Sequence, residues 1–122
     1  MTMSCTITQT RSTSVKKIKM VVVSASNGTA SGTTTYKYDG EVLRFVAVPA
    51  AAADQPTDQF DILLNDADGL DVLAGKGANL SNAASTTKVD TDGLGAVANS
   101  AITLAATNLG DTKTVTLYLY IR

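Results

Sequence analysis

The stretch TTTYKYDGEVLRFVAVP, residues 33–49, decides the fold that this sequence predicts. It reads as two β-strands joined by Asp39 and Gly40, a pair that tolerates the positive φ angles of a two-residue type I′ turn. A turn of this type places Tyr38 opposite Glu41 on the neighbouring strand. The first expectation is therefore a β-hairpin within a fold of antiparallel strands.

The second strand of this hairpin carries apolar side chains on both faces. Alternation along the strand defines one face with Leu43, Phe45 and Ala47 and another with Val42, Arg44, Val46 and Val48. We expect one face to pack the core and the other to meet a further protein surface. Pro49 is expected to end the pairing because proline has no backbone N–H to donate.

Two further segments show the period of two that marks a half-buried strand. Residues 15–24, VKKIKMVVVS, place Ile18, Met20 and Val22 on one face and lysines on the other. Residues 113–121 alternate threonine and tyrosine with Lys113, Val115, Leu117, Leu119 and Ile121. We expect the first segment to be a strand and the second to be the central strand of its sheet.

Shorter strands are expected between these segments. QFDILLND at 59–66 and LDVLAG at 70–75 are separated by turn residues, and TTKVDTDG at 86–93 reads as an edge strand anchored by Val89. About seven or eight short strands with no helical period predict an all-β fold, an antiparallel β-sandwich or jelly-roll-like barrel.

The chain is expected to hold one core, because 122 residues is the size of a single domain. Residues 15–122 are expected to form that single β domain. Residues 1–14 are polar, rich in threonine and serine, and are predicted to be an N-terminal arm. Two alternatives stay open for the arm: a disordered terminus, or a segment that becomes ordered on a neighbouring subunit.

Composition excludes several classes of function. A net charge of −1 and a pI of about 5.1 provide no long-range field for nucleic acid or an anionic membrane. With Cys5 as the one cysteine and no histidine, an intrachain disulfide, a Cys/His zinc site and a histidine-based catalytic pair are excluded. We therefore expect no enzyme activity, no cofactor and no metal. No segment reaches the length of about 20 apolar residues that a membrane helix requires.

Two short motifs resemble ligand-binding loops but lack the required spacing. DADGLD at 66–71 has the carboxylates of a calcium loop, yet the alignment puts Leu64 at the first ligand position. GLDVLAGKG at 69–77 has five residues between its first glycine and the Gly-Lys pair, where a phosphate loop has four. Turns stabilised by aspartate side chains are the preferred interpretation of both.

The four tyrosines offer a further hypothesis. Tyr36, Tyr38, Tyr118 and Tyr120 would form a stacking platform for sugars or bases if their two strands lay side by side. Half-exposed tyrosines on strand faces or in a subunit interface are the interpretation that we prefer.

Three segments together carry a family resemblance: TTTYKYDGEVLRFVAVP, FDILLNDADGLDVLAGKGANLSN and TVTLYLYIR. In their order, from about residue 15 to residue 122, the chain resembles a group of small structural proteins of tailed bacteriophages and prophages. The resemblance implies a virion component, a capsid decoration or cement protein, made in the host bacterial cytoplasm and located on the capsid surface. Its implied partners are the major capsid protein and further copies of itself, as a dimer or trimer.

Under this hypothesis the candidate interface residues are Tyr36, Tyr38, Arg44 and Arg11. Two alternatives share the same sequence features. One is a tail or head-to-tail structural component, and the other is a carbohydrate-binding β-sandwich module.

Overall fold

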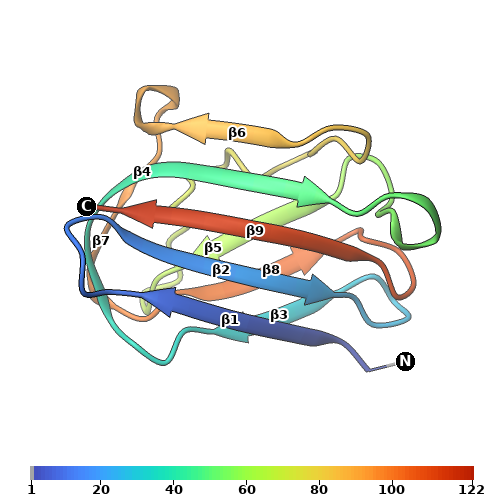
Figure 1. Ribbon diagram of the computed structural model, residues 1–122, viewed down its shortest axis with the longest axis horizontal. Helices are drawn as coiled ribbons and strands as arrows, with labels where there is room; N and C mark the ends of the chain where they lie inside the picture. Colours follow the sequence, from blue (N-terminus) through green and yellow to red (C-terminus); the bar gives the residue numbers. More distant parts are fainter. Residues whose placement is uncertain (1) are drawn as a thin grey trace.

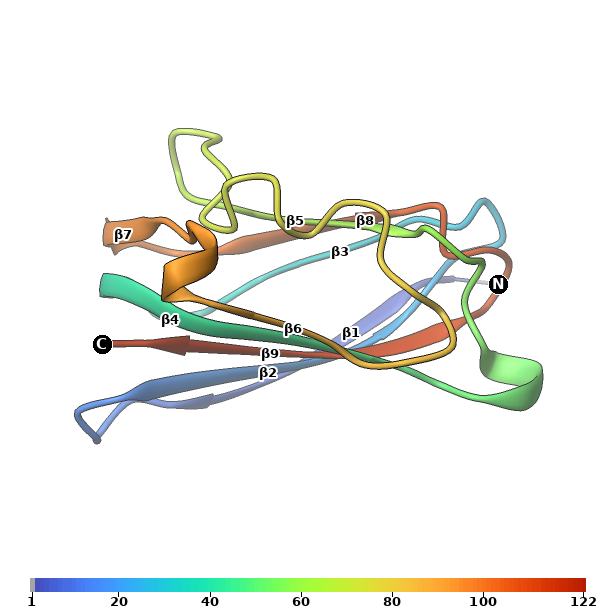
Figure 2. The ribbon, with the colours of Figure 1, turned by 90° about the horizontal axis from the view of Figure 1, so that it is seen from above.

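The computed structural model describes residues 2–122, which fold into two facing β-sheets (Figures 1 and 2). The larger sheet has the order β1 (Ser4–Thr10), β2 (Lys16–Val23), β9 (Thr114–Ile121), β4 (Tyr38–Pro49) and β6 (Thr86–Val89), and β7 (Ala96–Ser100) pairs with the start of β4. The smaller sheet has the order β3 (Ala30–Thr33), β8 (Thr103–Thr107) and β5 (Asp61–Asn65). Short 3₁₀ turns lie at Ala52–Asp54 and Asp90–Asp92.

All strand pairs are antiparallel, so the predicted all-β sandwich or barrel class is confirmed. The described residues form nine strands, where the sequence predicted seven or eight. None of the segments in residues 2–122 forms a helix long and apolar enough to cross a membrane.

Strand β9 is the central strand of the larger sheet, as its sequence predicted. It pairs with β2 from Lys16↔Ile121 to Val23↔Thr114, and with β4 on its other side. Alternate residues of β9 are buried: Val115, Leu117, Leu119 and Ile121. Strand β9 therefore joins the β1–β2 pair to β4 and the strands beyond it.

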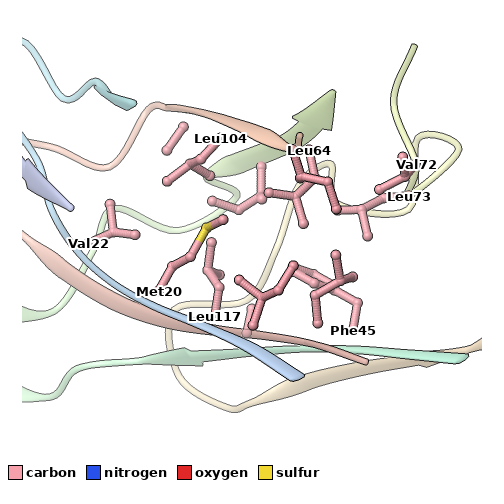
Figure 3. Close-up of a cluster of buried hydrophobic side chains, with 14 of the residues drawn as sticks. Met20, Val22, Phe45, Leu64, Val72, Leu73, Leu104 and Leu117 are labelled. Carbon is pink, nitrogen blue, oxygen red and sulfur yellow. The ribbon is translucent and has the colours of Figure 1, made fainter. Parts of the chain in front are cut away.

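The core lies between the two sheets (Figure 3). Figure 3 shows side chains of the larger sheet facing those of the smaller sheet and of the loop that follows β5. Among them are Met20, Phe45, Leu64, Leu73, Leu104 and Leu117. The predicted inward positions Ile18, Met20 and Val22 are at most 1 % exposed. The core is built mainly from aliphatic side chains, as the low aromatic content requires.

The predicted hairpin turn at Asp39 and Gly40 is wrong, because both residues lie inside the long strand β4. Gly40 has a φ of 132°, and a Cβ there would lie 2.3 Å from the carbonyl oxygen of Arg122. The backbones of Glu41 and Arg122 exchange two hydrogen bonds of 2.9 Å at this point. The glycine is therefore needed because the backbone of Arg122 approaches closely here. From the local sequence alone, the same glycine predicts a turn.

A register shift in β4 also changes the predicted faces of this strand. The pairing with β9 shifts between Val42 and Arg44, and Val42 is buried on the same side as Phe45. Leu43, which was predicted to share the core face with Phe45, is only half-buried. A bulge of this kind reverses the alternation on one side of it, so the prediction from strict alternation was wrong there.

The predicted N-terminal arm is also wrong for residues 4–10, which form β1. This strand pairs with β2 along its whole length, from Ser4↔Val23 to Thr10↔Lys17. Its inward side chains, Cys5 and Ile7, pack against the core. Because these two apolar residues are separated by threonine and flanked by polar residues, the sequence of β1 resembles that of a polar tail.

The segment 70–75 was predicted to be a strand but forms turns. The side chains of Val72 and Leu73 are buried, while the carboxylate of Asp71 accepts hydrogen bonds from the backbone of Leu64, Leu73 and Gly75. Strand β6 is an edge strand as predicted, but Val89 is 36 % exposed and does not anchor it. Strand β7 was not predicted.

Replacing Gly40 tests why β4 continues through the predicted turn. Gly40→Ala adds a Cβ against the Arg122 carbonyl at positive φ, so we expect it to lower the free energy of unfolding by about 2–5 kcal/mol. Gly69→Ala is the matched control, because Gly69 has a φ of 81° with no atom within 4 Å of the added Cβ. We expect it to cost about 1–2 kcal/mol. Equal losses in urea unfolding would contradict the close approach.

Candidate interaction face

The outer surface of the larger sheet is the candidate interaction face. Its centre is defined by the side chains of β2, β9 and β4 that point away from the core: Lys17, Lys19, Val21, Thr116, Tyr118, Tyr120, Arg44, Val46 and Val48. These positions alternate with the buried residues of the same strands. Figure 1 shows the strands of this sheet lying side by side.

Cationic side chains lie over the two tyrosine rings of this face. The Arg44 guanidinium carbon is 4.3 Å from the centroid of the Tyr120 ring, and these two residues are cross-strand partners. The ammonium nitrogens of Lys17 and Lys19 lie 5.9 and 5.8 Å from the Tyr118 ring centroid. Each such contact contributes about 0.5–1 kcal/mol at an exposed site. The two tyrosines of β9 therefore orient the cations of both neighbouring strands, β2 and β4.

The interaction face has a different charge from the chain as a whole. Three cations and no carboxylate occupy its central positions, although the chain has 11 acidic residues and a net charge of −1. By contrast, the outward positions of β5 and β8 hold Asp61, Leu63, Asn65 and residues with small side chains. Because cation and anion are segregated, the face is suited to an acidic partner surface.

One end of the face continues into an apolar groove. It has a volume of about 310 Å³ and is lined by Val15, Leu43, Arg44, Val89, Asp90 and Tyr120. The side chains of Val15 and Val89 are each 36 % exposed. The groove places apolar surface directly beside Arg44 and Tyr120, the combination that is typical of the centre of protein interfaces.

The predicted interface residues separate into three environments. Arg44 lies on the interaction face. Tyr36 and Arg11 lie together elsewhere, with the Arg11 guanidinium carbon 3.9 Å from the ring centroid, and Tyr36 is 47 % exposed. Tyr38 is 2 % exposed and belongs to the core, so its predicted surface role is wrong. The sequence alone does not give the pairing of the strands, and so it does not show which of these large side chains are buried.

Tyr38 connects β4 to the N-terminal strand. Its hydroxyl donates a 2.7 Å hydrogen bond to Oε1 of Gln9, and Nε2 of Gln9 donates in turn to the hydroxyl of Thr35. Burial raises the pKa of the Tyr38 phenol. The Tyr38 hydroxyl thus forms a polar contact that ties β1 to the sandwich.

The hypothesis of one platform of four tyrosines is not supported by the geometry, because Tyr38 is buried. Tyr118 and Tyr120 share the interaction face, but cations lie over their rings. The sequence predicts Lys17 and Lys19 on the outer face of their strand, and the pairing of β2 with β9 places them beside Tyr118. No motif in the sequence gives that register.

The two loops that resembled ligand sites have local structural roles. One carboxylate oxygen of Asp66 accepts hydrogen bonds from the backbone of Asp68 and Leu70, at 2.9 and 3.0 Å, as the turn interpretation predicted. In residues 2–122 no group of three or more His, Cys, Asp or Glu side chains is placed to hold a metal ion. Gly77 lies against the carbonyl oxygen of Ile62 and is part of a backbone contact between the loop and β5.

Comparisons of the chain with protein-family models, with curated proteins and with solved structures find no match.

The contact between Tyr38 and Gln9 gives a test of how β1 is held. Gln9→Leu removes the acceptor of a buried hydroxyl, so we expect the free energy of unfolding to fall by about 1–3 kcal/mol. Tyr38→Phe combined with Gln9→Leu removes both partners and should recover most of that loss. Chemical denaturation of the two single variants and the double variant measures this coupling. Additive losses would show that the two side chains do not depend on each other.

Proposed function

We propose that this chain is a structural component of a tailed-bacteriophage virion that decorates the outside of the capsid. In this role the interaction face lies on the lattice of major capsid subunits and stabilises the head. Support comes from two sources: the sequence resemblance to small phage structural proteins, and a surface chemistry suited to adhesion.

The observation that carries the proposal is the segregated chemistry of the interaction face. Arg44, Lys17 and Lys19 lie beside two tyrosines and several valines, with no carboxylate among the central positions. Arginine and tyrosine are enriched at protein interfaces, and the two lysines add electrostatic attraction to an acidic surface. The complementary partner is therefore a protein surface with exposed carboxylates.

The position of the face in the fold also suits a cement role. Its central residues belong to β2, β9 and β4, which are paired on both sides and hold the side chains on a stiff support. Little backbone conformational entropy is then lost on binding, so even modest contacts can give useful affinity. On a repeating lattice, many copies binding together add stability to the shell without a tight individual contact.

A carbohydrate-binding module is the second candidate, because Tyr118 and Tyr120 lie on one sheet face. Sugar stacking requires an accessible aromatic face, whereas the Arg44 guanidinium covers the Tyr120 ring at 4.3 Å. We therefore place this candidate second. A tail or head-to-tail component would use the same surface chemistry. Its position in the virion would distinguish it from a cement protein.

Charge reversal on the face tests the proposal. Purified protein is added to capsid shells that lack it, and both co-sedimentation and the temperature of shell disruption are measured. We expect Lys19→Glu with Arg44→Glu to weaken binding at least about tenfold, because attraction becomes repulsion. Lys76→Glu, combined with Lys37→Glu, makes the same charge change at two exposed positions outside the face and should bind like the unmodified protein.

Three results would contradict the proposal. Equal binding by the face variant and the control variant would exclude this surface. Failure of the unmodified protein to bind shells, with labelled protein found on the tail, would favour the tail component. Glycan binding by the isolated protein that is lost on Tyr118→Ala would favour the carbohydrate module.

A further inference from the structure

The free edge of β1 differs from the other sheet edges in residues 2–122. The two sheets have five edge strands: β1, β6 and β7 in the larger, and β3 and β5 in the smaller. The short strand β7 is irregular, with a register shift in its pairing with β4 and a positive φ at Asn99. An uncovered edge presents unpaired backbone N–H and C=O groups, and proteins normally protect it with charges, proline, bulges or covering segments.

The edge of β5 is covered by the loop that follows it. The backbone N–H of Ile62 donates to Gly77 at 2.7 Å, and the N–H of Val72 donates to Leu64 at 2.7 Å. Phe60 forms a further bridge with Leu80. This loop therefore occupies the hydrogen-bonding positions that another strand would need.

The edges of β6 and β3 are protected in other ways. Lys88 of β6 pairs with the buried Phe45, so its side chain lies on the inner side of the sheet at the margin of the sandwich. An inward-pointing charge on an edge strand opposes pairing with another chain. Strand β3 has four residues, and its Ser31 N–H contacts the sulfur of Met3 beside β1.

Strand β1 has none of these protections over residues 4–8. The segment SCTIT has no charge and no proline, and its register with β2 is regular. Strand β3 lies beside β1, and the connection after β3 contacts the far end of β1 through Thr35 and Gln9. Among the described residues, the backbone of residues 4–8 hydrogen-bonds only to β2, so the other edge of this neutral segment is unpaired.

Apolar surface is left partly exposed along this edge. Met3, Cys5 and Ile7 pack against the core but are only half-buried. Strand β3 packs closely against these side chains, because a Cβ on Gly32 would lie 2.7 Å from the sulfur of Cys5. The edge is therefore a preformed strand with an unpaired backbone and half-buried apolar side chains, which is the geometry that pairs with a further strand.

We propose that two copies of this chain pair antiparallel along β1, about a twofold axis at Thr6. In that register Ser4 faces Thr8, Cys5 faces Ile7, and Thr6 faces its own counterpart. The segment SCTIT reads hydroxyl, apolar, threonine, apolar, hydroxyl, so each side chain meets one of its own kind. Such self-complementarity is what a twofold interface requires, and threonine pairs across strands are favourable. A second copy is thus the occupant that the sequence of the edge favours.

The pairing would join the two interaction faces into one surface across a strip of threonines. Thr6 and Thr8 point to the same side of the larger sheet as Lys17 and Lys19. The inference concerns this chain with itself and does not depend on the capsid role. A chain that pairs in this way but binds no shell would leave the inference standing.

Charge substitutions at Thr6 test the pairing. Thr6 is exposed on the outer side, so Thr6→Lys and Thr6→Glu should fold normally, with unchanged thermal unfolding of the monomer. Either variant alone places like charges opposite each other, and we expect its dimer dissociation constant to rise at least about tenfold by sedimentation velocity. An equimolar mixture should restore the dimer. Thr87→Lys, on the opposite edge, is the matched control.

A cysteine at the axis tests the register. Thr6→Cys in a Cys5→Ala background should form a disulfide-linked dimer on oxidation, because paired strands hold Cα atoms about 4.5–5.5 Å apart. Thr116→Cys in the same background lies in the central strand and should not. The charge experiment retains Cys5 and remains decisive if the Cys5→Ala variants fold poorly.

Two results would overturn the inference. The first is unmodified protein that sediments as a monomer at its highest soluble concentration. The second is a Thr6→Lys variant that dimerises as strongly as the unmodified protein.

Discussion

The structure depends on the placement of β9 between β2 and β4. Its inward residues, such as Leu117 and Leu119, fill the middle of the core, while Tyr118 and Tyr120 on its other side support the cations of both neighbouring strands. Alternation at a period of two lets one strand supply both surfaces. Stability and surface chemistry are therefore separated side chain by side chain along the same eight residues, Thr114–Ile121.

The sequence predicted those parts of the fold in which the two sides of a strand differ strongly. In β2 and β9 aliphatic residues alternate with lysine, threonine or tyrosine, and both were recognised with the correct inward side. Strand β1 was missed because Cys5 and Ile7 are its inward apolar residues among polar neighbours. At Gly40 the Asp-Gly pair predicts a turn, but the strand continues because it contacts Arg122. These two residues lie far apart in the sequence. Long-range contacts of this kind leave no local pattern.

The candidate site was predicted only in part for the same reason. Arg44 was identified from its place within an apolar strand, and it does lie on the interaction face. Its contact with Tyr120, and the position of Tyr118 beside Lys19, follow from cross-strand registers that a single sequence does not contain. The choice of Tyr38 as an interface residue rested on its side-chain chemistry alone, and the structure buries this side chain in the core.

The most direct test of this division of roles compares two adjacent residues of β9. Leu119→Ala removes a side chain that is 2 % exposed, and we expect it to lower the free energy of unfolding by about 2–5 kcal/mol in urea. Tyr118→Ala removes an outward side chain with its contacts to Lys17 and Lys19, and should cost only about 1–2 kcal/mol. Similar losses for both variants, or a larger loss for Tyr118→Ala, would contradict the assignment of core and outer face to the two sides of this strand.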